Sequence, residues 1–447
     1  MSSRYSFFQS AIAQALGSDF QPKFDIPHQG GDSYRSFFDV NDFAMATTNA
    51  ALGEYGALVG AQQIDVDRRL ALLWFHLTTR PVGWEVGSVW DAIAGDYKCA
   101  DGWVRLHTNA PHHQKAALEV LDCAPEREAV EAVLRAKSKC DVEQAIVANN
   151  GCAAAMMSLS EWADHPQRRA LAASPLIEWT SRAGEIPNRK GLAGLKVLDL
   201  TRVLAGPVAT RFLAGFGADV LRIDPPHWNE PAVEVDVTLG KRCAGLDLRQ
   251  AEDRETLKRL ISEADLMIHG YRPGALAGMG FGPEEIADLN PNLCDISLCA
   301  YGWHGPWAGR RGFDSLVQMS CGIADEGMIR AGADKPVPLP VQALDFATGY
   351  LVAAAALRAL RLQQMDGRVS QARLSLARTA YLLTSSGAHD AMRGGLALSD
   401  KDFAPELEQT TWGPIQRVSP PYNVDGQGPS WPIAAGSLRR HAPEWSI

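Results

Sequence analysis

The chain has 447 residues, of which 46% are hydrophobic and 21% charged, with a formal net charge of -9. This length suggests two or three domains, and the composition is that of a folded protein rather than a disordered one. The acidic balance and the lack of a Lys/Arg block argue against a nucleic-acid-binding protein. The most apolar stretches, such as residues 350–356, are much shorter than the ~20 residues of a membrane span.

The N-terminal segment and the cysteines bear on the compartment. The first twenty residues contain one Arg and no sustained apolar region, so no secretory signal is predicted. Eight cysteines are scattered along the chain without a C-x-x-C pair, which indicates neither a zinc site nor a redox dithiol. We therefore expect reduced, mostly buried thiols and a cytoplasmic location.

Residues 42–58 form an Ala-rich stretch with Asp42 at its start, which is typical of a helix. A strand-like segment follows at residues 66–75. Both resemble a later pair, residues 345–360 and 369–378, so the sequence indicates a weak internal duplication. Chance similarity between two Ala-rich helices is the alternative interpretation.

Residues 92–182 differ in character from the rest of the chain. A hairpin is predicted with its turn at Asp101 and Gly102, followed by a helical segment at residues 124–147. The histidines of HTNAPHH, residues 107–113, have no carboxylate or cysteine spaced to complete a metal site. We expect no bound metal and interpret these histidines as hydrogen-bonded hairpin residues. The whole segment is interpreted as a smaller α+β domain.

A continuous apolar run at residues 195–200 is typical of a strand buried on both faces. Pro207 then suits the first turn of a helix, Gly215 and Gly217 suit its end, and residues 218–224 form the next strand. Because a parallel pair of strands needs such a crossover, this segment is predicted to be a β-α-β unit.

The alternation of helices and strands continues with a helix at 250–264, a strand at 265–270, a short helix at 283–289 and a strand at 293–302. A long helix is predicted from about residue 345 to 364, because this stretch is rich in Ala and Leu. The pattern indicates an α/β fold with a Rossmann-like, doubly wound parallel sheet covered on both faces. The glycines of residues 278–282 do not open the first β-α turn, so no NAD is expected.

Four of these segments together resemble the family III coenzyme A transferases, a group that also contains α-methylacyl-CoA racemases. They are residues 194–224, 271–302, 310–322 and 343–349. Residues 95–121 resemble the family's small domain, which normally follows those blocks, so the segment order is permuted or fused. The resemblance implies four parts: residues 1–91, similar to the later part of the large domain; 92–182, the small domain; 183–193, a linker; and 194–447, the large CoA-binding domain.

The resemblance implies that Asp345 is the catalytic residue. Moving CoA between two carboxylic acids without hydrolysing the thioester needs a covalent relay, in which a carboxylate attacks the acyl-CoA carbonyl. A helix N-terminus favours a negative nucleophile. On its own, an aspartate at a helix start is more often an N-cap, and the resemblance reverses that preference. Asp42 is the rival candidate, with less weight because no β-α-β unit precedes it.

The resemblance also implies which residues contact CoA, as a substrate rather than a permanently bound cofactor. Arg272 could pair with phosphate, although a surface role is equally compatible with the sequence. The full set of expected CoA-site residues is Val203, Ala205, Gly270, Tyr271, Arg272, Arg311, Phe313 and Asp314.

Two departures from the family pattern affect the function. The racemases have a catalytic His at the position of Phe313, and Phe cannot move a proton, so racemisation by that route is disfavoured. The Gly-Gly-Gly loop that some formyl-CoA transferases use to shield the intermediate is missing. The sequence therefore predicts a CoA transferase; an acyl-CoA racemase and a silent CoA-binding protein are the alternatives.

The expected partners are small molecules, an acyl-CoA and a carboxylic acid, with no nucleic acid and no membrane. Members of the family form interlocked homodimers, so the resemblance implies a homodimer here. The permuted segment order leaves the interlocking open.

Overall fold

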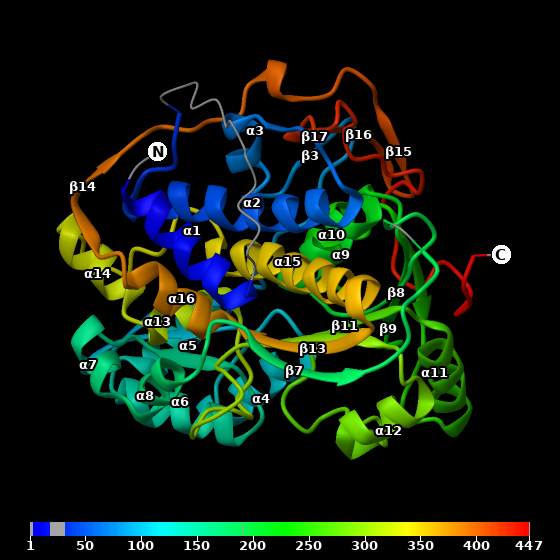
Figure 1. The fold of residues 1–447 in the computed structure, drawn as a ribbon. Coiled ribbons are helices and arrows are strands. Elements are labelled where there is room, and N and C mark those ends of the chain that lie inside the picture. Colours follow the sequence, from blue (N-terminus) through cyan, green and yellow to red (C-terminus); the bar gives the residue numbers. More distant parts are fainter. Residues whose placement is uncertain (1–2, 18–31, 190, 447) are drawn as a thin grey trace.

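A computed structural model describes residues 3–17, 32–189 and 191–446 (Figure 1). Its centre is a seven-stranded sheet in the spatial order β10-β9-β8-β11-β12-β13-β7, parallel except for β7, which pairs antiparallel with β13. The strands are β7 (Glu178–Ala183), β8 (Lys196–Leu200), β9 (Asp219–Asp224), β10 (Lys241–Gly245), β11 (Leu266–His269), β12 (Cys294–Cys299) and β13 (Arg368–Ser375).

The strand order confirms the predicted doubly wound sheet. Counted along the chain from β8, the six parallel strands have the spatial order 3-2-1-4-5-6, so the winding reverses between β8 and β11. In sheets of this kind, ligands bind at the carboxyl ends of the strands beside that reversal. The loops that start at Thr201 and Gly270 therefore occupy the expected position for a ligand.

Helices cover both faces of the sheet (Figure 1). One face carries α9 (Ala205–Gly215), α15 (Ala343–Asp366) and α2 (Val40–Val59), which share the largest hydrophobic core. The opposite face carries α11 (Ala251–Glu263) and α12 (Pro283–Leu289), which enclose a second core. Helix α15 is long and apolar enough to cross a membrane, but 94% of its most apolar window is buried inside the protein. It is the central helix of the large core.

The site-bearing ends of α9 and α15 are held close together by a glycine. A Cβ at Gly349 would lie 2.5 Å from the carbonyl oxygen of Ala205, closer than carbon and oxygen can approach. Gly349 therefore lets α15 pack directly against the first turn of α9. This contact sets the distance between Asp345, one turn earlier on α15, and the loop that follows β8.

The N-terminal segment is interwoven with the C-terminal one. Helices α1 (Ser3–Leu16) and α2 pack on α15, and three short strands pair with strands from the end of the chain (Figure 1). The pairs are β1 (Ser36–Phe38) with β14 (Ala388–Arg393), β2 (Ile64–Val66) with β17 (Tyr422–Val424), and β3 (Thr79–Pro81) with β16 (Gly413–Arg417), which also pairs with β15 (Glu408–Thr410).

The strand predicted at residues 66–75 is wrong. Only β2 is extended there, and α3 (Arg68–Leu73) follows, because the Asp67 side chain accepts the backbone N–H of Leu70 and caps a helix. The later member of the proposed duplication does contain a strand, β13, followed by α16 (Leu376–Thr384). The two segments therefore share a leading helix and differ after it.

Residues 93–153 build a compact unit with its own hydrophobic core. A three-stranded sheet, β4 (Gly95–Cys99), β5 (Gly102–Leu106) and β6 (Ala153–Ala155), packs on α4 (Pro111–Leu121), α5 (Arg127–Leu134) and α6 (Lys139–Ala148). The predicted hairpin is confirmed, but its turn is at Ala100 and Asp101, since Cys99 pairs with Gly102. The single helix predicted at 124–147 is two helices, separated before Ser138, the N-cap of α6.

The remaining elements connect this unit to the large sheet or flank the candidate site. They are α7 (Leu159–Asp164), α8 (Pro166–Ala173), α10 (Pro231–Val237), α13 (Asp314–Ser320), α14 (Ile323–Ala331) and two short 3₁₀ turns, η1 (Ala277–Met279) and η2 (Asp400–Asp402). The chain returns to the large sheet through β7, which pairs with β13. The last residues predicted for the small domain are therefore part of the large sheet.

Candidate active site

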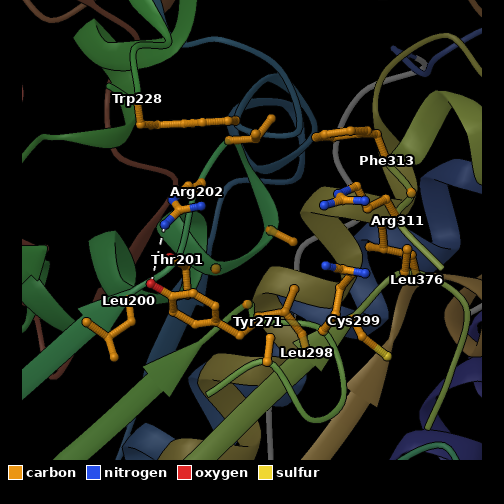
Figure 2. A pocket seen from close by; sticks show the side chains of 18 of the residues that line it. Leu200, Thr201, Arg202, Trp228, Tyr271, Leu298, Cys299, Arg311, Phe313 and Leu376 are labelled. Carbon is orange, nitrogen blue, oxygen red and sulfur yellow. Dashed lines mark hydrogen bonds between the residues drawn. The ribbon is translucent and has the colours of Figure 1, made fainter. Parts of the chain in front are cut away.

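A cavity of about 460 Å³ lies at the carboxyl ends of β8 and β11, where the strand order reverses (Figure 2). We call it the basic cavity. Its polar lining consists mainly of cationic or imidazole side chains: Arg202, Arg272, Arg310, Arg311, His112, His113 and His227. Among the described residues that line it, Asp345 is the one acidic side chain. This charge distribution suits a polyanionic ligand.

The loop after β8 is fixed by a buried polar network. Asp199 accepts hydrogen bonds from the Thr201 N–H (2.9 Å) and the Thr210 hydroxyl (2.6 Å), and forms an ion pair with Lys241 (3.1 Å). Burial acts to raise the pKa of Asp199, but the charges of Lys241 and Arg222 and the hydroxyl hydrogen bonds together lower it. A Cβ at Gly206 would lie 2.2 Å from the Thr201 Cβ, so the tight approach of loop and helix requires glycine.

Val203 in this loop has φ +66°, a conformation that costs energy for a β-branched residue. Its N–H donates to Glu230 Oε2 (2.9 Å), and the same oxygen accepts from Trp228 Nε1 (2.8 Å). Glu230 is itself held by a buried ion pair with Arg222 (2.5 Å). The carboxylate thus fixes both the strained loop and the indole of Trp228, and both line the cavity.

The arginines of the basic cavity differ in how far they are already paired. Arg310 donates to Glu143 Oε1 (2.6 Å) and to the Ala153 carbonyl (2.7 Å), so its charge is neutralised by the small unit. Arg311 makes one long hydrogen bond to Asn150 (3.3 Å), and Arg272 donates to the Gly309 carbonyl (3.0 Å). Burial and the nearby Arg311 lower the pKa of Arg272. Arg311 and Arg272 are therefore the cations most in need of an anion.

Aromatic side chains complete the basic cavity. Arg202 lies over the Trp228 ring (5.2 Å from its centroid), and its guanidinium donates to the Tyr271 hydroxyl (3.3 Å), as the dashed line in Figure 2 shows. Trp228 and Phe313 lie on opposite sides of the view. A cationic lining between aromatic faces suits a ligand that carries both phosphates and a planar ring.

Asp345 lies in the first turn of α15 and is 7% exposed. Its backbone N–H donates to Asp314 Oδ2 (2.9 Å), and its carboxylate makes no hydrogen bond to any residue that the structure describes. Burial and the neighbouring Asp314 charge raise the pKa of Asp345 well above that of an ordinary carboxyl. The N-cap interpretation is wrong, because Gln342 occupies the N-cap position and the Asp345 side chain does not cap the helix.

Asp314 supports this arrangement from α13. Its carboxylate accepts the backbone N–H groups of Leu344 and Asp345 and the Gln318 side-chain amide. Burial still raises the pKa of Asp314, although these donors and the more distant Arg105 oppose the shift. Asp314 therefore holds the start of α15 in place and adds a negative charge beside Asp345.

A second cavity, of about 220 Å³, also contains Asp345 in its wall. We call it the aromatic cavity, after its rings Trp90, Trp228, Phe313 and the imidazole of His107. It shares Val203, Trp228, Phe313 and Asp345 with the basic cavity. The two cavities therefore meet at the buried carboxylate of Asp345.

The histidines of residues 107–113 do not have the predicted role. His107 stacks on Phe313 (centroids 3.7 Å apart), and His113 meets the same ring edge-on (6.0 Å). The ring nitrogens of His113 and Nδ1 of His107 are buried without a hydrogen-bond partner among the described residues. Burial lowers the pKa of each imidazole to about 3, so both are neutral. They are cavity-wall residues rather than hydrogen-bonded hairpin residues.

The predicted site residues come together in space. Val203, Ala205, Gly270, Tyr271, Arg272, Arg311 and Phe313 line the basic cavity with Asp345, and Asp314 lines the aromatic cavity. The rival candidate Asp42 lies in the first turn of α2 and lines neither cavity. In the described part of the chain, no group of three or more metal-ligating side chains is found.

Several lining residues were not predicted, among them Trp228, Glu230 and His113. Trp228 and Glu230 lie in the loop after β9, whose carboxyl end is next to that of β8. The motif WNEP, which follows a predicted strand after three intervening residues, could have marked them, since neighbouring parallel strands end at the same edge. No local signal places His113, because it reaches the site from the small unit.

These features define a class: a doubly wound α/β protein with a cavity lined by basic side chains at the strand reversal and a buried carboxylate in its wall. Comparison with known proteins identifies the family within this class. Residues 192–410 match the model of CoA-transferase family III. This segment of the chain belongs to that family, as the resemblance in the sequence predicted.

Curated relatives match a similar share of the chain. Acetyl-coenzyme A transferase nodX of Hypoxylon pulicicidum is 35% identical over 204 residues, which are 44% of this chain and 32% of that protein. Succinyl-CoA:glutarate CoA-transferase of Homo sapiens is 31% identical over 206 residues, 42% of this chain and 46% of that protein. The chain thus spans about a third to a half of the length of these relatives.

Solved structures are similar over a comparable share. The crystal structure of Rv3272 from M. tuberculosis matches with 30% sequence identity and a TM-score of 0.40, and covers 44% of this chain and 57% of that one.

Proposed function

We propose that the protein transfers coenzyme A between carboxylic acids, with Asp345 as the nucleophile. The observation that carries this proposal is the position of Asp345, a buried carboxylate where a cavity suited to polyanions meets a second, aromatic cavity. A thioester whose CoA part occupies the first cavity and whose acyl part occupies the second would have its carbonyl carbon beside Asp345. The names of the relatives support the same reaction class.

The proposed reaction proceeds by a covalent relay that consumes no water. The Asp345 carboxylate attacks the thioester carbonyl, the C–S bond breaks, and CoA thiolate leaves behind a mixed anhydride. The thiolate then attacks the aspartyl carbonyl, which releases the donor acid and forms an aspartyl-CoA thioester. The acceptor carboxylate attacks this thioester, expelling thiolate, and a final attack by thiolate on the new acyl group restores Asp345.

The basic cavity is proposed to bind the CoA moiety as a substrate, with no permanent cofactor. Arg311 and Arg272 are assigned to its phosphates, because a guanidinium forms strong charge-assisted hydrogen bonds to phosphate oxygens. Tyr271 and Gly270 are assigned to the adenine end, and Val203 and Ala205 to backbone contacts at the start of α9. The choice of these residues follows the resemblance and agrees with the lining of the cavity, and their division among the parts of CoA belongs to this proposal.

Burial has two effects on Asp345: it raises the pKa of the carboxyl, and it also makes the ionised carboxylate more reactive. A carboxylate that is poorly solvated is a stronger nucleophile than one hydrated in bulk water. The stacked rings of Phe313 and His107 line the aromatic cavity together with Asp345. We infer that these rings protect the anhydride from hydrolysis.

The test is a transfer assay in which purified protein is mixed with one acyl-CoA and a different free acid. Appearance of the second acyl-CoA at the rate at which the first disappears, with parallel-line ping-pong kinetics, supports the proposal. Release of free CoA without a second thioester would refute transfer. The Asp345→Asn variant is the control, since it keeps the shape of the site and lacks the nucleophile.

One observation favours a second function, racemisation at the α-carbon of an acyl-CoA. The imidazole of His107 and the carboxylate of Asp345 line the same cavity and could act as two acid/base groups. Against this, a pKa of about 3 makes His107 a weak base. Incorporation of deuterium at the α-carbon in heavy water would support racemisation, and CoA binding without either reaction would support a silent binding protein.

The homodimer stays a prediction. The small unit of the same chain reaches the basic cavity through His112 and His113, so a single chain forms every wall described above. Sedimentation should give a dimer if the family's assembly is kept, and a monomer of one chain mass would contradict it. The cytoplasmic location is likewise a prediction.

A further inference from the structure

The aromatic cavity differs from the basic cavity in the charge of its walls. Its lining includes four carboxylates, Asp91, Glu230, Asp314 and Asp345, and among the residues for which a position is described it includes no lysine or arginine. We propose that this cavity binds the acyl group and selects apolar monocarboxylic acids, aliphatic or aromatic, over dicarboxylic acids. This inference rests on the proposed function, because an acyl group is present only if CoA thioesters bind.

The size and walls of the cavity suit such a chain. Its volume is about 220 Å³, and an apolar cavity of about 150 Å³ is enough to hold a benzene ring. Ten of the twenty lining residues are apolar. The largest of them are Trp90, Leu204, Trp228 and Phe313, and α10 adds Pro231, Ala232 and Val233. Burial of a hydrocarbon chain or ring against them is favourable.

Two of the four carboxylates already have hydrogen-bond or ion-pair partners. Asp91 accepts four, from the backbone N–H groups of Ile93 and Ala94 and from Thr108 and Gln114. Glu230 is paired with Arg222 and accepts from Val203 and Trp228. Asp345 is the proposed nucleophile, and Asp314 is bonded to the start of α15. All four shape the cavity, and in the ionised form that the reaction requires of Asp345 none of them offers a donor to an anion.

Two cations just outside the wall, Arg105 and Arg222, are also occupied. Arg105, whose charge acts on Asp314, lies over the Trp90 ring (4.7 Å from its centroid) and donates to Asp96 (2.7 Å). Arg222 is buried between Asp224 and Glu230. The neutral His107 supplies no charge. A second carboxylate at the far end of an acyl chain would find no cation here and would face Asp314.

The consequence is selection by charge. Taking a carboxylate out of water into a site without a counter-ion is costly, and like charges close together add to the cost. An acyl chain that ends in a methyl or phenyl group meets neither penalty. We expect kcat/KM for glutaryl-CoA to be at least about 100-fold below that for pentanoyl-CoA, a thioester of the same chain length that ends in methyl.

The experiment compares pentanoyl-CoA, 3-phenylpropanoyl-CoA and glutaryl-CoA as donors to one fixed acceptor, acetate. A preference for the first two supports the proposal, and their ratio distinguishes an aliphatic from an aromatic chain. Equal or better use of glutaryl-CoA overturns it while leaving the transferase function intact. If no donor reacts, the proposed function fails. Calorimetric titration with free 3-phenylpropanoate and glutarate then tests the cavity alone. Equal binding of the two acids would overturn the proposed selectivity.

A charge-insertion variant tests the reason for the preference. Val89 lines the cavity and is 42% exposed, so a longer side chain can be placed there without disturbing the core. Val89→Lys should raise the ratio of glutaryl-CoA to pentanoyl-CoA turnover at least about 10-fold, whereas the matched neutral variant Val89→Gln should leave the ratio within about twofold. The same ratio in both variants would overturn the charge argument.

Discussion

Arg310 and Arg311 are neighbours in the sequence, and the structure predicts different effects when each is removed: loss of Arg310 should lower stability, and loss of Arg311 should weaken CoA binding. Arg310 is 7% exposed in its side chain, as is its partner Glu143, and the two are 2.6 Å apart. Removing one partner of a buried ion pair leaves an unpaired buried charge and typically costs about 3–5 kcal/mol. We expect Arg310→Ala to lower the free energy of unfolding by that amount.

Arg311→Ala should instead weaken CoA binding with little effect on stability. Among the residues that the structure describes, its one hydrogen bond is to Asn150 and is 3.3 Å long, so its loss should change the free energy of unfolding by no more than about 0.5 kcal/mol. Loss of a charge-assisted bond to phosphate costs about 1.5–3 kcal/mol, which raises the dissociation constant about 10- to 150-fold.

Urea unfolding and calorimetric titration with CoA measure the two effects separately. Arg311→Lys is the matched control and should recover part of the binding, because it keeps the charge and loses the planar fork. The reasoning is refuted if Arg311→Ala unfolds at much lower urea, or if its affinity for CoA is unchanged.

Three further predictions follow from the same contacts. Asp314→Asn removes a like charge from beside Asp345 and should lower the pKa of Asp345. The acid limb of the profile of kcat/KM against pH should then move to lower pH, and an unmoved limb would argue against Asp345 as the ionising group. Asp345→Asn should be more stable to urea than the unsubstituted protein at pH 8. The raised pKa means that the folded state favours the protonated carboxyl. This contribution to stability is present at low pH and is lost as pH rises through the folded pKa. The difference in stability between the variant and the unsubstituted protein should therefore shrink as pH falls. Gly206→Ala should cost about 1–3 kcal/mol of stability, because the new Cβ would lie 2.2 Å from Thr201, and CoA affinity should fall with it; unchanged unfolding would contradict the tight loop packing.

The large sheet could be predicted because its information is local. The run ending at Leu200 and the short helix starting at Pro283 each form continuous patterns of one period, and the structure has β8 and α12 there. The N-terminal segment could not be predicted in this way. Its strands β1, β2 and β3 have three residues each and pair with strands near the end of the chain, so no local pattern specifies them.

The candidate site divides along the same line. Residues such as Val203 and Arg272 follow strand ends, and the strand order alone brings them together. His113 and His107 reach the site only because the small unit is fixed against the large sheet, in part by the ion pair of Arg310 and Glu143. The raised pKa of Asp345 also arises from a tertiary contact, with Asp314 on another helix, and no single segment of the sequence contains it.

The central claim is that Asp345 forms the covalent intermediate. The direct test is to incubate the protein with an acyl-CoA, trap the intermediate with hydroxylamine or borohydride, and locate the modified peptide by mass spectrometry. The account predicts modification of Asp345 and none in the Asp345→Asn variant. Modification of Asp42 would contradict the assignment of the site and keep the reaction, and a protein that binds CoA without forming any adduct would contradict the relay itself.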